Sequence, residues 1–127
     1  MRVAPRMAAL IAALALALAG GVQAQAPDGT ASADGAVLRG LDKVAGAAQD
    51  IELRVGESVN YGRLTITLSE CRYPVGNPAA DAFAQLVIHD ARRTEPVFRG
   101  WMIASSPALN AMDHPRYDVW VIRCTSS

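Results

Sequence analysis

The chain has 127 residues, 51% of them hydrophobic, and its 12 Lys and Arg residues balance 12 Asp and Glu residues. This length accommodates one small domain and excludes a multidomain enzyme, while the apolar content excludes an intrinsically disordered protein. The even charge balance excludes a generic electrostatic attraction to nucleic acid, which needs a basic excess.

The first 24 residues have the three-part pattern of a secretory signal peptide. Arg2 and Arg6 form a basic start, Met7 to Ala19 is an uncharged apolar run, and Val22-Gln23-Ala24 places small residues before a cut after Ala24. Thirteen residues span only about 20 Å as a helix, short of a bilayer core of roughly 30 Å. We therefore predict a periplasmic protein, exported by a cleaved signal peptide (residues 1–24) and without a transmembrane segment afterwards. A cut after Ala26 and a retained N-terminal anchor are the alternatives.

Residues 25–36 are small and polar and include no bulky apolar side chain. This composition is typical of a disordered tether, which we predict for residues 25–36. Residues 37–127 are then expected to form a single β-rich domain.

Apolar and polar residues alternate with a period of two through most of this domain, which indicates half-buried strands. We expect strands at Leu38–Lys43, Ile51–Val55, Leu64–Ser69, Phe83–Ile88, Val97–Met102 and Tyr117–Cys124. Gly56–Gly62 is interpreted as a turn region and Arg92–Pro96 as a polar loop. The predicted fold class is all-β: a small antiparallel sandwich or barrel of about six to seven strands, with one short helix before the last strand.

That helix is expected over Ser105–Met112. Ser106 is a suitable N-cap, and Pro107 fits the first helical position. His114-Pro115 would end the helix, because proline disfavours helical geometry in the residue before it.

Cys71 and Cys124 are the two cysteines of the chain. In an oxidising compartment an isolated pair forms one disulfide most simply. A loop of this length corresponds to about 4 kcal/mol of stabilisation as an upper estimate. A redox-active pair is the alternative, but it lacks the C-x-x-C spacing.

A serine hydrolase would use Ser105 or Ser106 with His114 and Asp113. Neither serine lies in a G-x-S-x-G motif, and a helix cap and helix stop account for the same residues. A metal site would use His89-Asp90 and Asp113-His114, but no H-E-x-x-H or Cys/His framework is present. We therefore predict no catalytic residue, no metal and no cofactor.

The two tryptophans are expected to be core residues. Trp120 shares a strand face with Ile122 and Cys124, and Trp101 follows Gly100. An exposed Trp101 would instead stack on a sugar or anchor a partner protein. Arg92 and Arg93 are interpreted as a solvated loop tip, with a phosphate or lipid headgroup contact as the alternative.

The segment from Gly100 to Pro115, followed by Tyr117 to Cys124, closely resembles an uncharacterised family of exported proteobacterial proteins, domain of unknown function 2155 (DUF2155). Leu38–Lys43 and Gly62–Ile66, followed by Cys71, also resemble that family. Asp113 stands where the family often has Glu. The resemblance implies a periplasmic protein with paired cysteines and carries no established activity.

Together these features predict a non-enzymatic binding or accessory protein of the cell envelope. The expected partner is an envelope protein, such as the periplasmic face of an inner-membrane complex. The predicted contact residues lie near the C-terminus: Trp101, Leu109, Met112, His114 and Tyr117. A glycan- or peptidoglycan-binding domain is the alternative, and a small serine hydrolase is a remote one.

Overall fold

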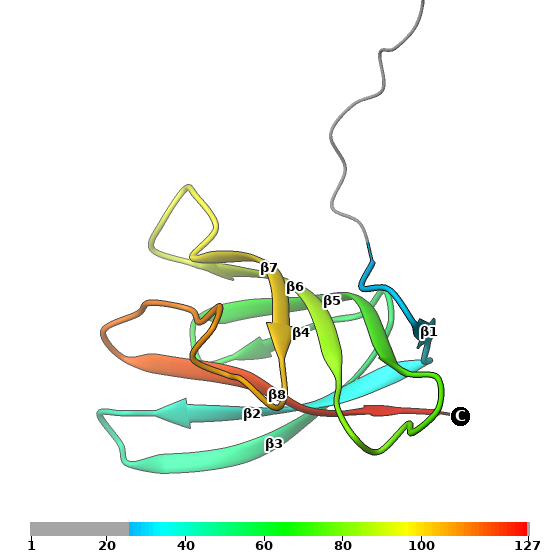
Figure 1. Cartoon of the computed structure of the whole chain (residues 1–127). Helices are drawn as coiled ribbons and strands as arrows, with labels where there is room; N and C mark the ends of the chain where they lie inside the picture. Colours follow the sequence, from blue (N-terminus) through cyan, green and yellow to red (C-terminus); the bar gives the residue numbers. More distant parts are fainter. Residues whose placement is uncertain (1–25, 127) are drawn as a thin grey trace, which may run out of the picture.

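Two antiparallel sheets face each other in the computed structural model, which describes residues 26–126 (Figure 1). The strands of the described chain are β1 (Thr30–Ser32), β2 (Gly35–Asp42), β3 (Ala47–Arg54), β4 (Ser58–Tyr61), β5 (Leu64–Pro74), β6 (Phe83–Asp90), β7 (Phe98–Ile103) and β8 (Tyr117–Thr125). One sheet has the order β1-β5-β6-β7, with β4 also pairing with β5, and the other has the order β3-β2-β8. The all-β, sandwich-like class is confirmed, with eight strands in place of the expected six to seven. The predicted signal peptide lies outside the described residues.

The alternation along β5 explains how the two sheets pack. Leu64, Ile66 and Leu68 point inward and are fully buried, whereas Thr65 and Thr67 lie on the outer face. Each such buried aliphatic side chain contributes about 2 kcal/mol, so this stripe is a main source of stability. Opposite it, the three-stranded sheet supplies its own buried residues from β2 and β8: Ala36, Leu38, Val119 and Val121.

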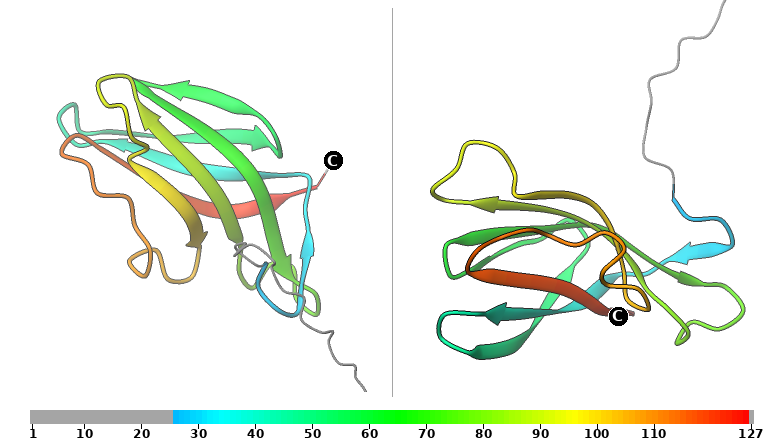
Figure 2. Two further views of the ribbon diagram at one scale, coloured as in Figure 1. Left: turned by 90° about the horizontal axis from the view of Figure 1, so that it is seen from above. Right: turned by 60° about the vertical axis from the view of Figure 1, so that its left-hand side comes forward.

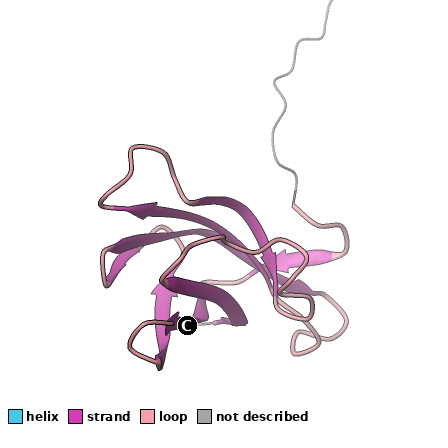
Figure 3. Ribbon diagram, turned by 90° about the vertical axis from the view of Figure 1, so that its left-hand side faces the viewer, coloured by secondary structure: helices cyan, strands magenta, loops and turns pink. Residues whose placement is uncertain are grey.

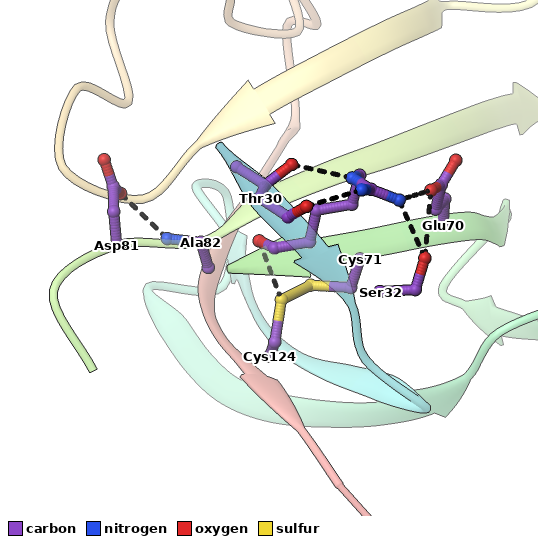
Figure 4. Close-up of a disulfide and its surroundings, with 8 residues drawn as sticks. Thr30, Ser32, Glu70, Cys71, Asp81, Ala82 and Cys124 are labelled. Atoms are coloured by element: carbon purple, nitrogen blue, oxygen red, sulfur yellow. Dashed lines mark hydrogen bonds and ion pairs between the residues drawn. A yellow bond between two sulfur atoms is a disulfide. The ribbon is translucent and has the colours of Figure 1, made fainter. Parts of the chain in front are cut away.

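The predicted disulfide joins the two sheets. Cys71 of β5 and Cys124 of β8 are bonded with their Cα atoms 5.8 Å apart, within the normal range for a disulfide (Figure 4). The pairing predicted from the sequence is therefore confirmed. It connects two strands that belong to different sheets and restrains the sandwich at one end.

The predicted tether over residues 25–36 is wrong in its second half. Thr30–Ser32 form β1, which pairs with the end of β5, and β2 already begins at Gly35. The guanidinium of Arg72 donates to the Thr30 hydroxyl and carbonyl at 2.7 Å each and to the Ser32 hydroxyl at 2.8 Å (Figure 4). A short polar strand has no alternation to detect, and its partner lies about 40 residues away in the sequence.

The predicted turn region Gly56–Gly62 is wrong in its centre, where Ser58–Tyr61 form β4. The glycines at both ends do mark turns, with φ values of 91° at Gly56 and 59° at Gly62. A Cβ atom at Gly62 would also collide with the Tyr117 ring. Tyr61 is buried in the core, and this anchor holds the short strand against β5.

The predicted helix over Ser105–Met112 is absent, and no helix occurs among residues 26–126 (Figure 3). The segment forms successive turns, in which the Ser106 amide donates to the Ile103 carbonyl and the Leu109 amide to the Ser106 carbonyl. The hydrogen bonds of a helix of two turns rarely offset the unfavourable free energy of helix nucleation without further packing. The segment belongs to the β7–β8 loop, residues 104–116, which the side chains described below fix to the sandwich. Accordingly, none of the described residues forms a helix able to span a bilayer.

Candidate functional site

A buried histidine anchors the end of the β7–β8 loop. His114 is 2% exposed, and its Nε2 lies 2.7 Å from Oδ2 of Asp90 in β6. Its Nδ1 accepts hydrogen bonds from the backbone amides of Arg116 and Tyr117, at 3.0 and 3.1 Å. Because Nδ1 acts as an acceptor, the pattern assigns a neutral imidazole with its proton on Nε2, donated to Asp90. Both ring nitrogens are therefore engaged within the domain.

Asp90 is a buried carboxylate whose charge is fully compensated. It accepts hydrogen bonds from His114, from the Arg92 amide at 2.9 Å and from Nε of Arg63 at 3.0 and 3.1 Å. The His114 hydrogen bond above all, followed by the Arg92 amide and the Arg63 guanidinium, holds the pKa of Asp90 well below its usual range. The carboxylate thus stays ionised and connects β6, the β4–β5 turn and the β7–β8 loop.

The base of the β7–β8 loop is also held at the end of β2 by hydrogen bonds. Arg116 donates to Asp42 at 2.9 Å, and Lys43 donates to the His114 carbonyl at 2.7 Å. The Arg116 hydrogen bond is the largest cause that lowers the pKa of Asp42 to about 2. The guanidinium of Arg116 also lies 5.2 Å from the centre of the Tyr117 ring, a cation–π contact. We call Asp42, Arg63, Asp90, His114, Arg116 and Tyr117 the anchor cluster.

The geometry does not assemble the residues of the predicted hydrolase alternative. The Ser105 hydroxyl donates to Asp81 at 2.6 Å, and the Ser105 amide donates to the same carboxylate at 2.9 Å. Since both nitrogens of His114 are bound elsewhere, the hydroxyl–imidazole bond that a triad needs is not formed.

The residues of the metal alternative point to different environments. His89 is exposed, whereas Asp90 is buried beside His114, so neighbouring positions of β6 face opposite sides of the sheet. Within residues 26–126 no three His, Cys, Asp or Glu side chains are grouped so that they could hold a metal ion.

The predicted contact residues divide into buried and accessible ones. Met112, His114 and Tyr117 are buried, which corrects their placement in an accessible contact surface. Leu109, at the turn of the β7–β8 loop, is 72% exposed. Trp101 is half-buried, its indole N–H is shielded without an acceptor among the described residues, and its carbonyl accepts from the Asn110 side chain at 2.8 Å.

A groove runs beside the exposed part of this loop. It has a volume of about 380 Å³ and is lined by Pro107, Ala108 and Ala111 of the loop and by Asp118, Val119 and Trp120 of β8. Most of these side chains are apolar, and Asp118 is the charged one among them. Grooves of this size and character accommodate a side chain or a small ligand. The groove and Leu109 together form the candidate binding site.

Trp120, which we expected in the core together with Ile122 and Cys124, is half-buried instead, because the core-facing side of β8 is the opposite one. Tyr117, Val119 and Val121 form the core-facing side of β8, whereas Trp120 packs against the core only in part and borders the groove. Both faces of this strand carry apolar residues, so alternation alone does not tell which face is inside.

Comparison with known proteins assigns the family. Residues 36–124 match the model of a family described as uncharacterised and conserved in bacteria, DUF2155. The chain belongs to this family. The match covers the sandwich from β2 to β8, including both cysteines and the whole β7–β8 loop, and it confirms the resemblance noted in the sequence.

A curated relative of this DUF2155 protein is an uncharacterised protein of Rickettsia prowazekii (strain Madrid E). The two are 28% identical over 87 residues, which is 66% of this chain and 56% of the relative. The chain thus spans little more than half of the relative's length. No solved structure matches the chain significantly. The family and the relative carry no described activity, so function has to be argued from the site.

Proposed function

We propose that this DUF2155 protein is an exported, non-enzymatic binding module that recognises a protein of the cell envelope through its β7–β8 loop. The observation that carries the proposal is an exposed leucine on a loop whose base is held by buried groups. Leu109 is 72% exposed, whereas His114, five residues later, is 2% exposed. An apolar side chain presented by a fixed loop suits a protein contact, because little conformational entropy is lost on binding.

The groove supports the same proposal. Ala108 and Ala111 flank Leu109 in the sequence and line the groove next to Trp120. A partner that covers Leu109 would therefore also reach a concave apolar site for a side chain of its own. Interfaces commonly gain most of their affinity from such a central apolar anchor.

The proposed compartment is the periplasm. The disulfide between the sheets favours an oxidising environment, and the N-terminal sequence pattern favours export. A non-enzymatic role is favoured because Ser105 and His114 are each engaged in bonds that fix the loop. An accessory role on an inner-membrane complex is one form that this function would take.

Glycan binding is the second candidate, and one observation favours it. Trp120 and Asp118 line the same groove, and an aromatic ring beside a carboxylate is a common way to hold a sugar. In this case peptidoglycan would retain the purified protein, and a Trp120→Ala variant would lose that retention.

The test uses tagged protein in its own host, light crosslinking in intact cells and identification of the copurified proteins. Leu109→Asp places a charge in the proposed contact, and Val44→Asp is the matched control because Val44 is 75% exposed in the β2–β3 turn. We expect one envelope protein to be recovered with the parent chain and with Val44→Asp, and to be lost with Leu109→Asp. Equal recovery with both variants would refute the proposed site.

A further inference from the structure

The outer face of the five-stranded sheet carries apolar side chains that the sandwich does not cover. Phe83 and Val87 of β6 and Trp101 and Ile103 of β7 are all half-buried. Phe83 pairs with Ile103 across the two strands, so these residues lie on one continuous surface. We call the surface formed by these four residues and by three nearby arginines, Arg92, Arg93 and Arg99, the outer basic face.

Three arginines accompany this surface. Arg99 is directly opposite Val87 on the same two strands, and Arg92 and Arg93 lie in the β6–β7 loop. All three are exposed, and their guanidinium groups make no ion pair or hydrogen bond within residues 26–126. The guanidinium groups of Arg63, Arg72 and Arg116, by contrast, are each paired with a carboxylate.

Little acidic charge balances these arginines. Glu95 is the exposed carboxylate of the β6–β7 loop, whereas Asp90 is buried and Glu70 of β5 is paired with Arg72. The chain as a whole has as many acidic as basic residues, so the excess of positive charge on this face is local. The ligand that complements it is anionic.

The position of the β6–β7 loop favours a ligand that extends over the outer face of the five-stranded sheet. The β6–β7 loop rises from the five-stranded sheet away from the three-stranded sheet (Figure 1, Figure 3). Residues 26–29, which lead into β1, lie at the other end of the same sheet, where β1 pairs with the end of β5 (Figure 2).

We propose that the outer basic face docks on an anionic membrane surface. Guanidinium groups bind phosphate oxygens in a bidentate manner, and tryptophan prefers the depth of the lipid headgroups. Arg92, Arg93 and Arg99 would contact headgroups, while Trp101 and Ile103 would lie at the boundary with the acyl chains. The proposal is independent of the β7–β8 site, because it uses different residues on the outer surface of the opposite sheet.

The test measures sedimentation of the purified protein with vesicles that contain phosphatidylglycerol and with vesicles of phosphatidylcholine alone. Arg93→Gln/Arg99→Gln removes two positive charges from the outer basic face. Arg54→Gln/Arg123→Gln is the matched control, because it removes two exposed charges from the three-stranded sheet. Each arginine near an anionic surface contributes about fivefold to partitioning, so we expect about tenfold or greater loss in the first variant and little loss in the second.

A second readout reports on the face directly. Trp120→Phe leaves Trp101 as the single tryptophan of the chain. Its fluorescence should shift to shorter wavelength with phosphatidylglycerol vesicles and stay unchanged with phosphatidylcholine. Three results would overturn the proposal: equal loss of binding in both arginine variants, equal binding to both kinds of vesicle, or binding to soluble heparin with no vesicle binding.

Discussion

Within the β7–β8 loop, residues 112–116 and residues 105–111 lie in opposite environments. Residues 112–116 include the buried Met112 and His114, and they connect through the anchor cluster to β2 and β6. Residues 105–111 are exposed except for the half-buried Ser106, and they include Leu109 and the rim of the groove. Fixing one half of a loop by buried polar groups allows the other half to present apolar side chains in a defined geometry. Substitutions in the two halves should therefore differ in what they damage.

The largest effect is expected for His114→Ala. It removes the acceptor of two backbone amides and the donor to Asp90, and it leaves a cavity in the interior. We expect a loss of about 3 kcal/mol in the free energy of unfolding, measured by urea denaturation. His89→Ala, on the exposed side of β6, should change it by less than about 0.5 kcal/mol. Similar effects of the two substitutions would contradict the anchoring role.

Acidification should weaken the anchored half through Asp42. The pKa of this carboxyl is lowered from 3.8 to about 2, chiefly by its hydrogen bond with Arg116. A lowered pKa in the folded state means that the stabilisation is present above about pH 4 and is lost as the pH falls towards 2. Urea denaturation across this range should show a smaller decrease in stability for Asp42→Asn than for the parent chain. A parallel decrease would show that Asp42 is not linked to folding.

A smaller effect is expected for Asn110→Ala in the exposed half. The Asn110 side chain donates to the Trp101 carbonyl and closes the loop over β7. Loss of this hydrogen bond should lower the free energy of unfolding by about 1 kcal/mol and should speed amide hydrogen exchange within the β7–β8 loop. Asn77→Ala, in the exposed β5–β6 loop, is the control and should change neither quantity. If both variants behave alike, the exposed half is held by other contacts.

Leu109→Ser should have the smallest effect on stability. Its side chain is largely exposed, so the free energy of unfolding should change by less than about 0.5 kcal/mol in urea. Binding to the envelope partner should nevertheless fall. A large loss of stability would mean that Leu109 belongs to the packed structure and not to a contact surface.

The sandwich was largely predictable because its main signals are local. Leu64, Ile66 and Leu68 alternate with polar residues. Cys71 and Cys124 are the two cysteines of the chain, so one intramolecular pairing is possible. The short β1 and β4 were missed because pairing with β5, and not their own composition, makes them strands.

The candidate site was less predictable because its contacts are distant in the sequence. His114 is interpretable locally as the end of a helix, yet its partner Asp90 precedes it by 24 residues. The two faces of β8 are similarly apolar, so the position of Trp120 depends on the packing of the whole sandwich. Leu109 is exposed, as a contact residue has to be, and its role in binding stays a prediction.

The most direct test of the central claim places a photoreactive amino acid at position 109, and in a separate variant at position 44, in the tagged protein in its own host. Both positions are exposed, but only position 109 lies in the proposed site. We predict that illumination of intact cells links position 109 to one envelope protein and links position 44 to none. Crosslinks to the same protein from both positions, or from neither, would contradict the claim that the β7–β8 loop binds a partner.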